Sequence, residues 1–226
     1  MFKIRLVNLV LSTILIFPFA ISAQEKINQF DANGKRIGVW KKYHTNNRIR
    51  YQGQFEAGKE VGVFKFYSPL KSDHPISIRT YQKDSDIAKV QFFSVDGVLE
   101  SAGAMQGKNR IGTWNYYHKD GKTLLSDENY KDGMLHGKSS TYYKTGALTE
   151  VLNYEKNQLN GIALRYDSNG IVISEVTYKN GRLNGWAKYY TPEGKMKYQG
   201  AYENDEKVGT WEYFENGKSK KVDKSE

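Results

Sequence analysis

Large apolar residues recur at a fixed interval along this chain, in short stretches separated by turns that contain glycine. The clearest stretches read Gly-Thr-Trp-Asn-Tyr-Tyr at 112–117, Gly-Trp-Ala-Lys-Tyr-Tyr at 185–190 and Gly-Thr-Trp-Glu-Tyr-Phe at 209–214. The interval is 24 to 26 residues, which is typical of an array of similar supersecondary units. Such arrays usually bind partners along an extended face.

Each unit begins with a glycine, or with alanine in one copy, and we number positions within a unit from that residue as zero. These residues are Gly38, Gly62, Ala88, Gly112, Gly137, Gly161, Gly185 and Gly209. Position 5 is aromatic in every copy: Tyr43, Tyr67, Phe93, Tyr117, Tyr142, Tyr166, Tyr190 and Phe214. Eight matches in eight copies, when aromatic residues make up 14% of the chain, exclude a chance pattern.

The turns between the apolar stretches predict β-hairpins. Asp-Gly at 96–97 and 120–121 and Asn-Gly at 169–170 and 180–181 provide the positive φ angles of tight hairpin turns. The stretches of about 8 residues between turns are rich in Tyr, Trp, Thr and Val and show no helical period. We therefore expect an all-β fold, an elongated single-domain antiparallel β-meander or solenoid of about eight hairpin repeats and 16 strands.

Aromatic residues fall on both faces of these predicted strands, because positions 2 and 4 have the opposite parity to position 5. One set must form the core. The other is either covered by curvature of the sheet or exposed as a ladder that binds a protein segment or a glycan. The candidates for partner contact are the large residues at positions 2 and 4: Trp40, Phe64, Phe66, Trp114, Tyr116, Tyr189, Trp211 and Tyr213.

The repeated residues resemble a known family. The segment Tyr-Gln-Gly-Gln-Phe-Glu-Ala-Gly-Lys-Glu-Val-Gly-Val-Phe at 51–64 is similar to the MORN repeat, which reads Tyr-x-Gly-x-Trp/Phe-x-x-Gly-x-x-x-Gly. The copy at 130–137 resembles the bacterial variant, whose members often carry an antitoxin label. The resemblance covers about residues 30–217. It implies scaffolding, dimerisation, membrane apposition or protein binding, and it brings no catalytic residue.

The third copy departs from this pattern, since Ser85 and Ala88 replace two glycines and an expansion precedes it at 68–75. Two prolines in that expansion predict a longer loop. The loop is either neutral variation or a functional protrusion.

The N-terminus predicts export. Residues 1–23 contain a basic start, an apolar stretch from Leu6 to Ile21 and small residues before a cleavage site after Ala23, as in a secretory signal peptide. We expect a periplasmic or extracellular protein. The alternative of an uncleaved membrane anchor requires a longer and less interrupted apolar stretch. The chain has no cysteine, so its stability must come from the sheet, without disulfides.

A net charge of +9 favours anionic partners. We expect a repeat domain at 24–217 followed by a basic, disordered tail at 218–226. The expected partner is a protein, with an anionic membrane surface or envelope polymer as the alternative. Sheet edges allow a homodimer, and export disfavours nucleic acid. A third hypothesis is an antitoxin or immunity protein.

The sequence predicts neither catalytic nor metal or cofactor sites. It contains no nucleophile motif of the Gly-x-Ser-x-Gly or Ser-x-x-Lys type. The four histidines, His44, His74, His118 and His136, lack metal-ligand spacing. His44 and His118 both occupy position 6, which varies among the copies and which we expect to be exposed.

Overall fold

The computed structural model describes residues 26–82, 84–216 and 218–224, so the predicted signal peptide lies outside the described residues. The described chain forms eighteen strands and no helix, and it therefore has no helix that could cross a membrane. The strands are β1 (Gln29–Phe30), β2 (Arg36–Tyr43), β3 (Ile49–Glu56), β4 (Lys59–Tyr67), β5 (Pro75–Tyr81), β6 (Ile87–Phe93), β7 (Leu99–Gln106), β8 (Asn109–Tyr117), β9 (Leu124–Lys131), β10 (Met134–Tyr142), β11 (Leu148–Glu155), β12 (Gln158–Leu159), β13 (Gly161–Tyr166), β14 (Val172–Lys179), β15 (Arg182–Tyr190), β16 (Met196–Glu203), β17 (Glu206–Glu215) and β18 (Lys218–Lys224).

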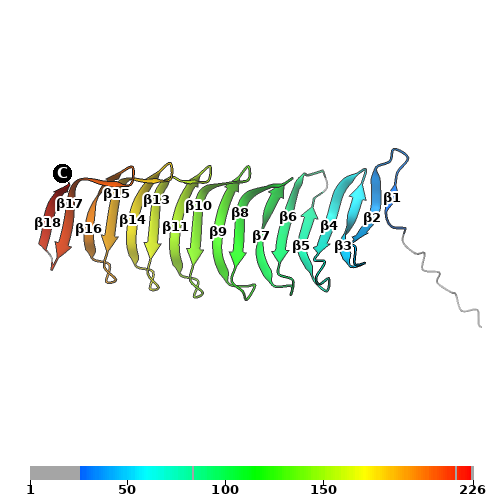
Figure 1. Ribbon diagram of the computed structural model, residues 1–226, viewed down its shortest axis with the longest axis horizontal. Helices are drawn as coiled ribbons and strands as arrows, with labels where there is room; N and C mark the ends of the chain where they lie inside the picture. The colour runs from blue at the N-terminus through cyan, green and yellow to red at the C-terminus, as the bar shows by residue number, and fades with distance from the viewer. Residues whose placement is uncertain (1–25, 83, 217, 225–226) are drawn as a thin grey trace, which may run out of the picture.

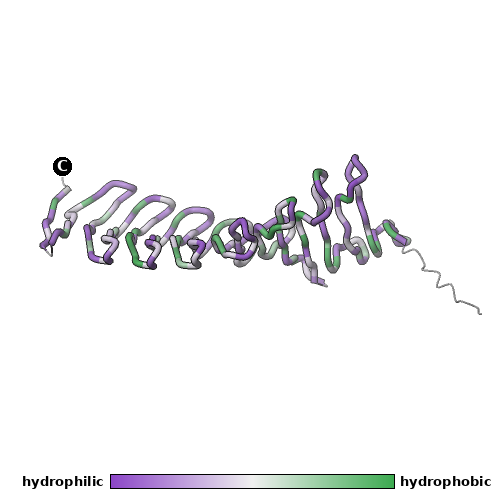
Figure 2. Tube along the Cα trace, turned by 90° about the horizontal axis from the view of Figure 1, so that it is seen from below, coloured by the Kyte–Doolittle hydropathy of each residue, from purple (hydrophilic) through white to green (hydrophobic). Residues whose placement is uncertain are grey.

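Each strand pairs antiparallel with its neighbours in the sequence, so the chain folds as one long meander (Figure 1). β12 and β13 both pair with β11 and act as one strand interrupted at Asn160. The strands follow one another along the long axis, and the sheet twists along its length (Figure 2). This arrangement confirms the predicted all-β hairpin meander.

The glycine that begins a unit lies in a β-bulge. Gln52 and Gln54 of β3 face Lys65 and Val61 of β4, so two extra residues of β4, beginning at Gly62, bulge from the ladder. The φ angle of Gly62 is 65°, a conformation that costs glycine little and other residues more. Every glycine at the start of a unit has a positive φ angle, which is 88° at Gly137.

The third unit lacks this bulge, which explains how alanine can replace its glycine. β5 and β6 pair without a shift of register from Ser77 opposite Phe92 to Tyr81 opposite Ala88. Ala88 consequently keeps a negative φ angle and is buried.

One face of the sheet carries three hydrophobic clusters. The buried residues at position 2 are central to them: Trp40 and Phe64 in the first, Val90 and Trp114 in the second, and Ala163, Ala187 and Trp211 in the third. Half-buried tyrosines and phenylalanines from neighbouring strands pack around them. We call this side the aromatic face.

Large and small residues alternate between neighbouring strands on the aromatic face. Gly53, Gly103 and Gly200 lie beneath the rings of Phe64, Trp114 and Trp211, so closely that a Cβ atom on each glycine would be 2.3 to 2.4 Å from the ring. Where position 2 is a small residue, the facing residue is larger, as for Val176 opposite Ala187. This exchange keeps the single-layer core filled along the array.

The basic C-terminal segment forms a strand, which differs from the disordered tail expected from its composition. β18 pairs with β17 from Glu215 opposite Lys218 to Gly209 opposite Lys224. Pairing supplies partners for the backbone groups of β17, and the side chains of Lys218, Lys220 and Lys221 are exposed to solvent. The described sheet therefore ends at 224 and includes the residues that we had separated at 218.

Candidate partner-binding surfaces

The structure places the eight predicted contact residues on one face but leaves few of them accessible. Trp40, Phe64, Trp114 and Trp211 are only 0–3% exposed. Their rings fill the core, so they cannot form the exposed ladder that the sequence allowed. Phe66, Tyr116 and Tyr189 are half-buried, and Tyr213 alone of the eight is exposed.

Cationic side chains cover much of the aromatic face. Arg36, Arg110 and Lys207, each two residues before the unit glycine, lie 4.9, 4.6 and 4.1 Å from the ring centroids of Trp40, Trp114 and Trp211. These distances are typical of cation–π contacts. Since the chain's own cations occupy these ring surfaces, they are not free for a cationic ligand.

Arg110 also organises a polar cluster on this face. Its Nη1 donates to the hydroxyl oxygens of Tyr116 at 2.7 Å and Tyr130 at 3.2 Å, and Tyr130 donates to Glu128 at 2.6 Å. Burial raises the pKa of Tyr116 well above its ordinary value, and the hydrogen bond with Tyr130 adds to the effect. Burial likewise raises the pKa of Tyr189. Both phenols stay neutral at physiological pH and serve the packing of the face.

The opposite face carries positions 1, 3 and 5 of each unit. At position 3 a polar row runs from strand to strand, with Lys188 Nζ 3.1 Å from Glu175 and Gln199 donating to Glu212 at 3.1 Å. The aromatic residues of position 5 flank this row, and all except the exposed Tyr43 are half-buried. This face is therefore polar along its centre and aromatic along one side.

Position 1 of the opposite face carries the most accessible tryptophan of the chain. Trp186 is 60% exposed, whereas the other three tryptophans are at most 3% exposed. Ile162, at the same position of the preceding unit, is 48% exposed. Thr177 of β14 lies between them, paired with Ile162 and donating its hydroxyl to the backbone carbonyl of Trp186 at 3.1 Å. We call Ile162, Thr177 and Trp186 the Trp186 patch.

Trp186 was not among the contact residues predicted from the sequence, which all lie at positions 2 and 4. A signal was available, since Trp186 immediately precedes Ala187 and so must point away from a small residue at position 2. The parity of the unit thus assigns Trp186 to the face opposite Trp40, Trp114 and Trp211.

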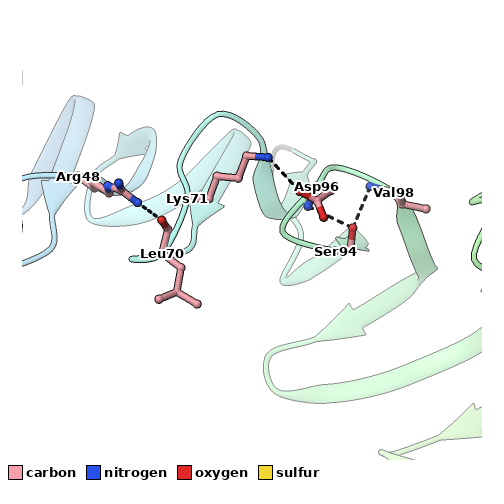
Figure 3. A network of polar contacts seen from close by, with 6 residues as sticks. All are labelled: Arg48, Leu70, Lys71, Ser94, Asp96 and Val98. Carbon is pink, nitrogen blue, oxygen red and sulfur yellow. Dashed lines mark hydrogen bonds and ion pairs between the residues drawn. The ribbon is translucent and has the colours of Figure 1, made fainter.

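The longer loop at 68–75 is held by the turns on either side of it (Figure 3). Arg48 donates to the carbonyl of Leu70, and Lys71 Nζ lies 2.9 Å from Asp96. Lys71 holds the pKa of the Asp96 carboxyl below its usual value. Leu70 is 79% exposed, and its side chain points away from these partners (Figure 3). The predicted loop is present at 68–74, whereas Pro75 is the first residue of β5 and pairs with Tyr67. The loop holds an apolar side chain in solvent.

Position 6 stabilises the turns and is exposed only at Glu215 of the last copy, although its variability had suggested an exposed position throughout. His44 Nε2 lies 3.1 Å from the carbonyl oxygen of Tyr67 in the next unit. In other copies the side chain accepts from backbone N–H groups of its own turn, as Asp167 does from Asn169 and Ile171. Within the described residues, no group of three or more His, Cys, Asp or Glu side chains is placed to hold a metal ion.

Comparisons with known proteins agree with this architecture. The family model described as "MORN repeat variant" matches residues 135–156 and 159–180, which are adjacent segments of the array. No curated relative matches the chain.

Among solved structures, the chain is similar to one in the crystal structure of TcdB2-TccC3-Cdc42, with 13% sequence identity and a TM-score of 0.21. The match covers 83% of this chain and 14% of that one, so this chain spans a small part of its length, and a score this low supports no conclusion. The repeat period and the hairpin units extend along the described chain, and the family match identifies residues 135–156 and 159–180 as MORN repeats of the variant type.

Proposed function

We propose that this protein is a non-enzymatic binding or scaffold module of the cell envelope, which engages a protein partner along the face that carries the Trp186 patch. The observation that supports this most is the 60% exposure of Trp186 on a rigid strand. Tryptophan is among the residues that contribute most to binding energy at protein interfaces. A chain with three tryptophans in its core exposes the fourth next to a second large apolar residue.

The architecture suits this function. A single-layer meander of eighteen strands presents a long continuous surface, and rigid strands position contact residues more accurately than loops do. The polar row at position 3 borders the Trp186 patch through Lys188 and Glu175. An apolar centre with a polar rim is the usual composition of a protein interface.

A salt-resolved capture experiment tests this proposal. The chain from residue 24 would be immobilised and exposed to solubilised envelope extract at low and at high salt, with retained species identified by mass spectrometry. We expect a discrete protein to remain bound at high salt, because contacts centred on an apolar patch are weakly screened.

The variant Trp186→Ala should lose this protein, and Ile162→Ala should retain less of it than the unmodified chain does. Val63→Ala should retain it, because Val63 occupies the same unit position and is 48% exposed, as Ile162 is, but lies five units from Trp186. Retention of lipid or polymer alone, and only at low salt, would instead support binding to anionic surfaces through the net charge of +7 that remains of the +9 without Lys3 and Arg5. A retained secreted toxin would support the immunity hypothesis.

A further inference from the structure

The two edges of the sheet differ in how they are protected. At the N-terminal edge, β2 is covered by residues 28–30: β1 pairs with Arg36 and Ile37, Asn28 N–H donates to the Val39 carbonyl at 2.8 Å, and Asn28 Oδ1 accepts from Lys41 N–H at 2.9 Å. At the other edge, no segment of the described chain pairs with the outer side of β18. Every second residue of an edge strand directs its N–H and C=O groups outward, so β18 offers a free row of backbone partners.

The open edge is strongly basic. β18 reads Lys-Ser-Lys-Lys-Val-Asp-Lys at 218–224, with four lysines against one aspartate. Lys218 and Lys221 face Glu215 and Glu212 of β17, while Lys220 faces the uncharged Tyr213. Among Lys218, Lys220 and Lys221, whose side chains are exposed, Lys220 is therefore the one without an acidic residue opposite it.

The same charge argues against a second copy of the chain as the occupant of this edge. Two β18 strands would bring lysines against lysines. At the N-terminal end, β2 is only partly covered by β1 and carries Arg36, Lys41 and Lys42, so a head-to-tail contact would also join two basic strands. Like charges directly opposite one another in a strand pair are destabilising.

Side-chain alternation along β18 specifies the pattern that an added strand must carry. Lys220 and Val222 are two residues apart and point to the aromatic face, where Val222 lies opposite Trp211 and is itself exposed. A strand paired with β18 would place one residue opposite Lys220 and another, two positions away, opposite Val222. We infer that β18 accepts an extended acidic segment of another protein by strand addition, with an acidic and an apolar residue spaced two apart on one face.

This site is separate from the Trp186 patch, which lies on the opposite face of β15, so the two can be tested independently. The probe is a labelled eight-residue peptide with threonine at every second position. Glutamate and valine take turns at the positions between the threonines, so that they are spaced two apart on one face. Its matched control has lysine in place of glutamate. Binding to the full chain would be followed by fluorescence anisotropy.

We expect the glutamate peptide to bind saturably and the lysine peptide not to bind. Lys220→Glu should weaken the affinity for the glutamate peptide by roughly tenfold, because the attractive cross-strand pair becomes repulsive. The same change should allow the lysine peptide to bind, because its repulsive pair becomes attractive. Lys89→Glu removes an exposed lysine from β6, an interior strand, and should leave both peptides unchanged. Trp186→Ala should also have no effect.

Several outcomes would overturn the inference. These are binding of neither peptide, equal binding of both, an equal effect of Lys89→Glu and Lys220→Glu, and self-association of the chain through β18 measured by sedimentation. The last would identify a second copy as the occupant. Loss of peptide binding in Trp186→Ala would place the peptide on the face proposed for the larger partner instead of at the edge.

Discussion

Gly103 of β7 lies directly beneath the indole ring of Trp114 in β8. A Cβ atom built on Gly103 would be 2.4 Å from the Trp114 ring, and the indole Nε1 donates to the carbonyl of Ala104 at 2.9 Å. The two residues thus form one packing unit across neighbouring strands. The same relationship recurs between Gly53 and Phe64 and between Gly200 and Trp211. It explains why the repeat uses glycine at a position whose φ angle does not require it.

Gly103→Val should destabilise the protein by about 1–3 kcal/mol, because the new side chain must displace the buried Trp114 ring. Ala102→Val is the matched control, since Ala102 is the preceding residue and points to the opposite face. Chemical denaturation of both variants measures the difference. Equal free energies of unfolding would contradict the packing relationship.

Gly137→Val should cost about 1–3 kcal/mol for a different reason, namely its positive φ angle of 88°. Space is not limiting there, because the nearest atom to an added Cβ is Asn129 Cβ at 3.9 Å. Ser139→Val, two residues along the same strand, is the control. If the two variants melt at the same temperature, the bulge does not impose this backbone conformation.

Ala88→Gly should destabilise the protein by about 0.5–1 kcal/mol, although it restores the residue found in the other seven copies. Ala88 lies in a regular, bulge-free pair with Tyr81, so glycine would add only flexibility to the unfolded chain and remove a buried methyl group. Thermal melting would detect the change. Stabilisation by this substitution would indicate that the third unit contains the bulge after all.

Alkaline pH should weaken the fold. Burial raises the pKa of Tyr116 and Tyr189. A tyrosine of the unfolded chain, by contrast, has a pKa of about 10. Above that pH the unfolded chain loses phenol protons that the folded chain keeps, so this contribution to stability is complete below it and is lost as pH rises. Melting temperatures from pH 8 to about 11 should fall more steeply for the unmodified protein than for the variant with Tyr116→Phe and Tyr189→Phe. Parallel curves would contradict the assignment.

The sequence predicted the hairpin array because its strongest signals are local. Turn residues such as Asp96-Gly97 and the recurring glycine fix the period without any knowledge of long-range contacts. The loop at 68–75 followed from its prolines in the same way. Ala88 was a sequence signal that the third unit differs from the others. That the difference is a missing bulge is visible only in the regular pairing of β5 with β6.

The binding surface was harder to predict, because parity shows that two sets of residues lie on opposite faces but not which set is buried. That choice depends on neighbouring strands: Gly103 makes room for Trp114, and no comparable space covers Trp186. The strand at 218–224 was missed because its composition is that of a flexible tail, while its structure comes from pairing with the edge of β17.

The most direct test of the account is a quantitative comparison of partner binding by three variants. With the captured protein in solution and the chain immobilised, Trp186→Ala should weaken binding by at least about tenfold, which corresponds to the loss of a central interface residue. Ile162→Ala should weaken it less, and Val63→Ala should leave it unchanged. All three should keep the melting temperature of the unmodified protein within a few degrees, because the side chains are exposed. Unchanged binding by Trp186→Ala would contradict the proposal that this protein engages its partner through the Trp186 patch.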